Sequence, residues 1–356
     1  MKDGMIGRLM PPVLFLVMVM ILLGVFSQPA VAGSRIYMRV DSFSYSEPVS
    51  IHAAINSWRG NYSGGQQQST WNWFELGVRF DRWGVGLLYR FDMALDFSPD
   101  TADLYYASEN RLANEPRRIY RLDLHALRYS ATGVRLRMDQ SLNQQLHLQW
   151  GLSLFHADDL VDGRLQGSSH TAVIDYFYSK DELFERSVPR PIGVGTSVDL
   201  NLRWLSNTGF RLNAWMTDLL GYIDWNKAPF TRATASSDRE VIEENGTLSL
   251  QPLVSGTMGT KPDFVQRLRP RLQLSLSQQI AAGINGLFEY RYQRGHSFVG
   301  PGVSWQRGNS ELGTRYWPGI DSIELFVQRP GWRLSLAMDM LSRHDARALW
   351  FRFVLN

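Results

Sequence analysis

The chain has 356 residues, with 37 basic and 34 acidic side chains, and its formal net charge of +3 argues against a nucleic-acid partner. It has no cysteine, which excludes disulfides, thiolate metal sites and a thiol nucleophile. Nothing in this composition requires a cofactor, and we expect none.

The first 32 residues have the three parts of a secretory signal. Lys2 and Arg8 give a positive start, Val13 to Phe26 is almost purely apolar, and Ala30-Val31-Ala32 provides small residues for cleavage. The apolar run is shorter than the ~20 residues that a membrane-spanning helix needs. The sequence therefore predicts a signal peptide over 1–32 and a single exported domain over 33–356.

The region from Arg35 to Trp58 comes next, and its pattern allows two structures. It fits one bent strand, and it also fits a strand followed by a segment that plugs the interior of a barrel. Both possibilities stay open at this point.

The stretch from Val85 to Phe97 has the clearest β pattern in the chain. Every second residue is apolar, while the residues between them include Arg90, Asp92 and Asp96. Successive side chains of a strand point to opposite faces, so one face is hydrocarbon and the other is charged. Thirteen residues at ~3.3 Å each, tilted by about 40°, would cross the hydrocarbon core of a bilayer. The stretch predicts a transmembrane β-strand.

The same alternation recurs at 134–138, 146–154, 198–204, 268–276, 288–292, 332–340 and 349–355. A soluble sandwich with this pattern would need two charged outer layers around one core, whereas a barrel around water explains it directly. We predict an all-β, antiparallel transmembrane β-barrel of about 16 strands. Fourteen is the close alternative, because Glu311–Trp317 and Ser322–Gln328 are short.

The connections are of two kinds. Tight turns are expected at 81–84, 130–133, 206–209 and 329–331, and long polar loops at 98–116, 179–191 and 225–262. Outer-membrane barrels place short turns on the periplasmic side and long loops outside. Leu212, Ala214 and Met216 are expected to face outwards, and strict alternation would place Asp218 on the same face. A β-bulge is therefore expected at Asp218.

With its signal segment, its alternating strands and an aromatic-rich last strand (Leu349, Phe351, Phe353), the chain resembles a Gram-negative outer-membrane β-barrel protein of the general porin-like class. One departure is its end, Val354-Leu355-Asn356, where such barrels commonly finish on an aromatic residue. The resemblance implies an outer-membrane location, contact with lipid and lipopolysaccharide, and insertion by the barrel-assembly machinery. It also implies assembly into homo-oligomers as one option.

Charged residues on the water-facing side are the candidate functional set. The candidates for lining the lumen or setting selectivity are Arg90, Asp92, Arg135, Arg137, Arg267, Arg269, Arg271, Glu289 and Arg291. One interpretation is a salt-bridge network that fills a rigid barrel. The other is a charged pore in which an arginine ladder, Arg267, Arg269 and Arg271 beside Arg291, attracts anions.

An enzyme is the weaker alternative. His296 and Ser297 lie near the external end of a predicted strand, but adjacent strand residues point to opposite faces and cannot act together as base and nucleophile. We therefore assign no catalytic residue. The histidines form no pair at metal-ligand spacing, so no metal site is expected either.

These observations favour an outer-membrane channel that passes small polar or anionic solutes through a charge-lined lumen. The first alternative is a plugged barrel that serves as the outer-membrane component of an export or assembly system. The second is an outer-leaflet enzyme that modifies lipids.

Overall fold

The computed structural model describes residues 34–112, 118–181, 185–242, 248–342 and 344–356. The signal peptide predicted over 1–32 lies outside this range.

The described chain is built from β-strands that form one 16-stranded sheet. The first eight are β1 (Ser34–Ser46), β2 (Gln67–Phe80), β3 (Trp83–Phe97), β4 (Arg121–Ser141), β5 (Leu146–Ser168), β6 (Thr171–Tyr178), β7 (Ile192–Leu205) and β8 (Arg211–Ile242). The others are β9 (Leu248–Arg267), β10 (Arg271–Ala281), β11 (Ile284–Gln293), β12 (His296–Arg307), β13 (Ser310–Trp317), β14 (Ser322–Arg329), β15 (Trp332–Met338) and β16 (Ala348–Leu355). The helical elements are α2 (Ile51–Ile55), α3 (Pro99–Glu109) and the short 3-10 turn η1 (Pro318–Ile320).

Fourteen of these strands close into an antiparallel barrel, and β6 and β9 are additions to it. Closure comes from two contacts: β1 pairs with β16, and β10 pairs with both β11 and β8. The predicted fold class is confirmed. The sheet has 16 strands, and 14 of them form the barrel.

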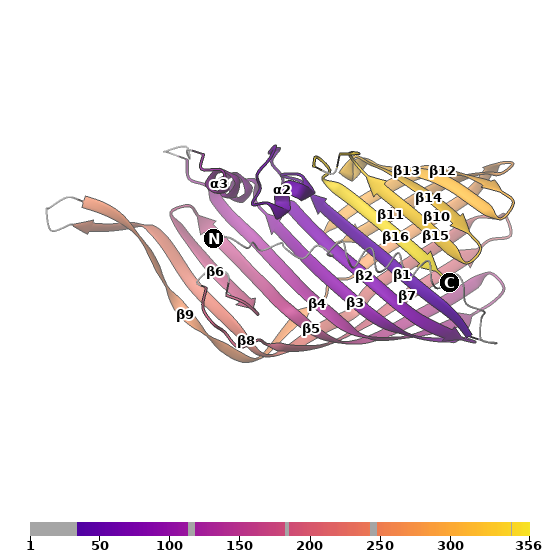
Figure 1. The fold of residues 1–356 in the computed structure, drawn as a ribbon, viewed down its shortest axis with the longest axis horizontal. Coiled ribbons are helices and arrows are strands. Elements are labelled where there is room, and N and C mark those ends of the chain that lie inside the picture. The colour runs from indigo at the N-terminus through magenta and orange to yellow at the C-terminus, as the bar shows by residue number, and fades with distance from the viewer. Residues whose placement is uncertain (1–33, 113–117, 182–184, 243–247, 343) are drawn as a thin grey trace.

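The additional strands belong to the long side of the barrel. β6 and β7 share one slot between β5 and β8, with β6 beside residues 161–167 of β5 and β7 beside residues 146–157. Among the described strands, β9 pairs with β8 alone, and together they form a ribbon that extends past the other strands, at the left of Figure 1. The long polar loop predicted over 225–262 is therefore wrong for most of its length, because its Thr- and Ser-rich sequence forms this ribbon.

Three of the four predicted tight turns are confirmed, at 81–84, 206–209 and 329–331. The turn expected at 130–133 is wrong, because β4 runs straight through it, and the irregularity is a bulge at Asp159 in the facing strand β5. The 98–116 loop contains α3, which the sequence analysis did not predict. Ser98 caps this helix by accepting a hydrogen bond from the Thr101 backbone N–H at 3.2 Å, and Pro99 occupies its first turn.

Residues 35–58 form no plug. They comprise β1, which is a wall strand between β2 and β16, followed by α2 at the rim. Helices α2 and α3 lie close together at the same end of the barrel in Figure 1. Trp58 and Ala102 pack around Phe97 of β3, so the upper part of the 85–97 strand is covered by protein.

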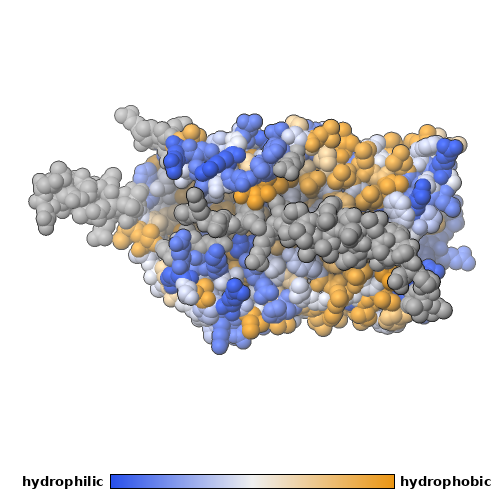
Figure 2. Space-filling model, in the orientation of Figure 1, coloured by the Kyte–Doolittle hydropathy of each residue, from blue (hydrophilic) through white to orange (hydrophobic). Residues whose placement is uncertain are grey.

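The outer face of the barrel is apolar. Leu87, Leu220 and Leu325 are 67%, 70% and 61% exposed, which is the pattern of a surface that faces lipid. Figure 2 shows apolar side chains over the right-hand part of one face, with hydrophilic ones gathered towards its left part and at its right edge. Among the described residues, no helix is long and apolar enough to cross a membrane.

Candidate functional site

The inner face of the barrel carries charged side chains that are buried. Arg90 and Arg135 are each only 2% exposed, and Glu289 is 1% exposed. A charge can be buried at this depth only when opposite charges and hydrogen bonds compensate its lost hydration. The ion-pair and hydrogen-bond partners of each buried charge therefore show how the lumen is filled.

The best-formed pair joins two strands that are not neighbours in the barrel. Arg90 of β3 donates two hydrogen bonds to the Asp218 carboxylate of β8, at 2.8 and 2.6 Å. β3 and β8 are not neighbours in the sheet, since β4, β5 and β7 lie between them, so this forked pair spans the lumen. Ser197 adds a hydrogen bond to Asp218 at 2.7 Å, and Tyr129 accepts one from Arg90 at 3.0 Å.

The bulge predicted at Asp218 is confirmed, and it explains this geometry. Asp218 has a left-handed backbone (φ 58°), and the register between β7 and β8 shifts beside it. A bulge re-aims a side chain that strict alternation would place on the other face. Asp218 is accordingly 1% exposed, whereas Leu219 and Leu220 beside it are exposed.

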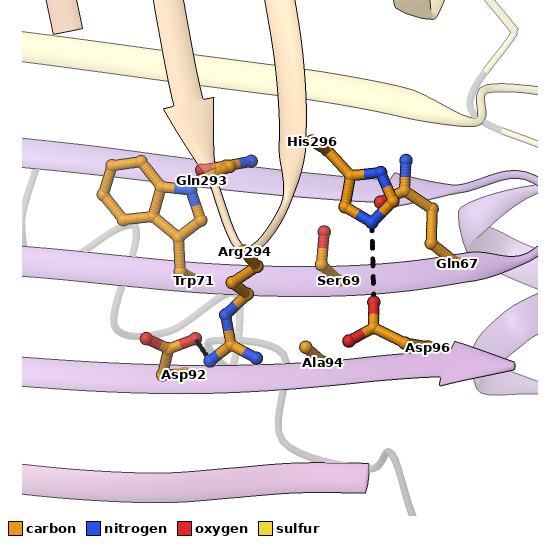
Figure 3. Close-up of a pocket in the computed structure, with 9 residues that line it drawn as sticks. All are labelled: Gln67, Ser69, Trp71, Asp92, Ala94, Asp96, Gln293, Arg294 and His296. Atoms are coloured by element: carbon orange, nitrogen blue, oxygen red, sulfur yellow. Dashed lines mark hydrogen bonds and ion pairs between the residues drawn. The ribbon is translucent and has the colours of Figure 1, made fainter. Parts of the chain in front are cut away.

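A second contact across the lumen centres on Asp92 of β3. Its carboxylate is paired with Arg271 of β10 and with Arg294, which lies 2.5 Å away in the turn between β11 and β12. Figure 3 shows this turn reaching towards β3, with Arg294 directed at Asp92. We call these five residues the lumen bridge: Arg90, Asp92, Asp218, Arg271 and Arg294.

A small pocket opens beside the lumen bridge. It is lined by Gln67, Ser69, Trp71, Asp92, Ala94, Asp96, Gln293, Arg294 and His296. Asp96 lies 3.5 Å from His296 and 3.7 Å from Arg269. Trp71 and Ala94 give the pocket an apolar side, while the amides and carboxylates give it a polar side.

Further charges fill the lumen beside β2 and β4. Glu75 is paired with Arg137 and accepts hydrogen bonds from Tyr37 and Trp73 at 3.1 and 3.3 Å. Arg135 lies 3.8 Å from Glu75 and is also paired with Asp199 of β7. A side chain at Gly151 would collide with the Arg135 guanidinium, so this glycine makes room for the arginine.

Apolar clusters flank the ion pairs on both sides. One contains Trp71, Trp73, Phe298, Trp317 and Trp350, and the other contains Leu127, Tyr129, Phe155, Leu160 and Trp225. The Arg90 guanidinium lies 4.8 Å from the Trp73 ring centre and 5.7 Å from that of Phe155, so it touches both clusters. The lumen combines aromatic walls with a layer of paired charges.

The structure brings together most of the predicted site residues. Eight of the nine candidates form ion pairs on the inner face, and Arg267 is the exception. Arg267 is exposed beside the exposed Tyr222, while Arg269 and Arg271 turn inwards after it. The three arginines therefore do not form one ladder, because β9 ends and β10 begins between them at residues 268–270.

Two members of the lumen bridge were not among the predicted site residues. Asp218 could be recognised from the sequence as unusual, because it interrupts the apolar alternation of β8 and so predicted the bulge. Arg294 could not be recognised in this way, because it lies in a turn where alternation says nothing about direction.

His296 and Ser297 have separate partners. His296 faces Asp96, and the Ser297 hydroxyl lies 3.0 Å from the Tyr290 hydroxyl. This agrees with the expectation that the two do not act together.

No protein-family model matches the chain, and no curated protein is similar to it in sequence. Its fold is similar to that of a TodX deletion mutant described as a monoaromatic hydrocarbon channel, with a TM-score of 0.45, 11% identity, and coverage of 93% of this chain and 92% of that one. It is also similar to the toluene transporter TbuX of Ralstonia pickettii, with a TM-score of 0.31, 9% identity, and coverage of 91% and 88%. The chain forms a closed antiparallel β-barrel with an apolar outer face.

Proposed function

We propose that the protein is an outer-membrane channel whose lumen is closed, in this conformation, by the lumen bridge. The observation that carries the proposal is a set of side-chain ion pairs that cross the lumen. They join β3 to β8, to β10 and to the β11–β12 turn, none of which is a neighbour of β3 in the sheet. The barrier is made of side chains, and side chains rearrange more easily than a barrel wall.

The barrier differs from an open, charge-lined pore, which the sequence favoured, and from a plugged export barrel, which was the first alternative. A permanently open pore needs an unobstructed lumen, whereas these charges meet and neutralise each other. A plugged export barrel needs a segment folded inwards, whereas within the described ranges the lumen is filled by side chains of the strands and one turn.

The pocket beside the lumen bridge supports a proposal for the class of solute. Trp71 offers an aromatic surface, and Gln67 and Gln293 offer hydrogen-bonding amides beside two carboxylates. Binding sites for small molecules commonly combine an apolar wall with a few placed polar groups. We therefore propose solutes that are small and carry an apolar body with a polar group.

Planar-bilayer recording tests the proposal. The double variant Arg90→Gln/Asp218→Asn removes the forked pair while leaving both residues able to hydrogen bond. We expect rare openings for the wild type and a severalfold higher open probability for the variant. A matched control is Arg203→Gln, which removes a half-exposed arginine that lies 3.7 Å from Asp139 and is not part of the lumen bridge. A folded double variant that conducts no more than the wild type would overturn the proposal.

A further inference from the structure

A group of charged side chains on β1 and β11–β16, all buried except for the half-buried Arg333, is not part of the lumen bridge. We call it the arginine cluster: Arg39, Arg291, Arg315, Arg333 and Arg352, with Asp41, Glu289 and Glu324.

The carboxylates of the cluster are shared between arginines. Asp41 lies 3.3 Å from Arg39 and 3.1 Å from Arg352. Glu289 lies 2.5 Å from Arg291 and 3.3 Å from Arg315. Arg352 Nη1 also lies 4.0 Å from Glu289, and this contact joins strands β1, β11, β13 and β16 into one network.

The remaining two members are joined to the network by Arg315. Its Nη1 lies 3.1 Å from Glu324 of β14. The guanidinium groups of Arg315 and Arg333 lie 4.8 and 4.5 Å from the centre of the same Phe326 ring. Arg333 therefore lies beside the network, although no carboxylate in the described part of the chain is within ion-pair distance of it.

The cluster has two positive charges in excess, since five arginines face three carboxylates. Arg39, Arg291 and Arg315 are 5%, 5% and 4% exposed, so bulk water does not compensate the excess. Burying an uncompensated guanidinium costs several kcal/mol. A bound anion would supply the missing charge.

The arginines also have unused hydrogen-bond donors. Buried nitrogens without an acceptor are Arg39 Nε and Nη1, Arg291 Nη1, Arg315 Nε, and Arg333 Nε and Nη2. In Arg333, Nε and Nη2 form one side of the guanidinium, and their two N–H bonds point in the same direction. This is the edge that binds a carboxylate or phosphate through two parallel hydrogen bonds.

We propose that the arginine cluster is a binding site for the oxyanion group of a small solute, a carboxylate or a phosphate, held by the Nε–Nη2 edge of Arg333. Arg315, on the same aromatic ring, adds a second positive charge. The inference rests on the proposed function in taking the anion to be part of a transported solute, but the binding equilibrium itself requires no opening of the channel.

Tryptophan fluorescence of the detergent-purified protein tests this site. Arg291 lies 3.1 Å from the ring centre of Trp350 and 4.7 Å from that of Trp317, so an anion in the cluster changes the surroundings of these rings. Sodium acetate and inorganic phosphate are titrated separately, with sodium chloride at equal ionic strength as the reference. We expect a saturable change with at least one of the two oxyanions, and the tighter of them identifies the group.

The variant Arg333→Gln should weaken this binding at least tenfold, whereas Arg333→Lys should keep the charge and lose most of the affinity because it lacks the forked edge. The matched control Arg329→Gln removes an exposed arginine from the same hairpin and should change the dissociation constant less than twofold. The gel shift on heating shows whether each variant has folded.

Two results would overturn the site: no saturable response of the wild type to either oxyanion, or equal binding by wild type and both Arg333 variants. A protein that binds an oxyanion but never conducts would keep the site and reject the channel. A protein that conducts but binds neither oxyanion would keep the channel and reject the site.

Discussion

The lumen bridge and the arginine cluster are both made of buried ion pairs, but they join different parts of the barrel. The arginine cluster includes pairs between neighbouring strands, such as Arg315 on β13 with Glu324 on the adjacent β14. The lumen bridge contains no such pair: its ion pairs join β3 to β8, to β10 and to the β11–β12 turn, none of which is next to β3 in the sheet. Pairs between neighbouring strands reinforce contacts that backbone hydrogen bonds already hold, whereas pairs between distant strands reach across the lumen.

The largest effect should come from Asp218→Asn alone. It leaves Arg90 buried without its carboxylate, and loss of one partner of a buried pair costs about 3–5 kcal/mol. Denaturant unfolding followed by tryptophan fluorescence measures this loss. Adding Arg90→Gln should recover much of the stability, because no unpaired charge then remains. If the single and double variants are equally unstable, the pair is not the source of the stability.

The variant Arg294→Gln should have the next largest effect. It releases the β11–β12 turn from Asp92, while Arg271 still neutralises that carboxylate. We expect a higher open probability in planar bilayers and faster amide hydrogen exchange in this turn, with little change in global stability. Unchanged exchange at residues 293–296 would show that the turn is held by other contacts.

Within the wall, Glu324→Gln should destabilise the barrel without opening it. Glu324 accepts hydrogen bonds from Arg315 at 3.1 Å and from Trp317 at 3.1 Å, and the amide keeps only part of this bonding. A loss of about 1–3 kcal/mol is expected, measured by denaturant unfolding. An increased conductance in this variant would erase the distinction between the two kinds of pair.

The smallest effect is expected outside the membrane, at Asp100 of α3. The Arg121 backbone N–H and the Arg118 guanidinium donate hydrogen bonds to this carboxylate and lower its pKa from the ordinary value. A group whose pKa is lowered by folding stabilises the folded state above its unfolded pKa of about 3.9. This contribution disappears as the pH falls through the folded pKa.

The rim helix should therefore exchange its amides faster at pH 3 than at pH 6, after correction for the intrinsic rates. The variant Asp100→Asn should show the faster exchange at both pH values. An acid-induced change of the same size in the variant would assign it to another group.

The regular strands were predictable because each has one face towards lipid and one towards the lumen. Val85 and Leu87 on the outside and Arg90 and Asp92 on the inside follow that rule. The β8–β9 ribbon, which extends past the other strands in Figure 1, was missed because its Thr- and Ser-rich sequence lacks the apolar alternation of the wall strands. The α3 helix was missed although Ser98 and Pro99 mark its start.

The lumen contacts could be predicted only in part. Alternation places Arg90 and Asp92 inside, but it does not say which wall each of them meets. That depends on how many strands close the ring and on where bulges shift the register, as at Asp218. The partner of Arg90 is 128 positions away in the chain.

The pairing of β1 with β16 makes closure of the ring depend on the last strand of the sheet. From Met38 beside Leu355 to Tyr45 beside Ala348, the first strand stays half-bonded until β16 is in place. Arg352 and Trp350 also reach Asp41 across this seam, at 3.1 and 3.0 Å. Without β16, the edges of β1 and β15 would be unpaired, and Asp41 would keep Arg39 but lose Arg352 as an ion-pair partner. One strand therefore completes both the backbone hydrogen bonds of the ring and the charge partners of Asp41.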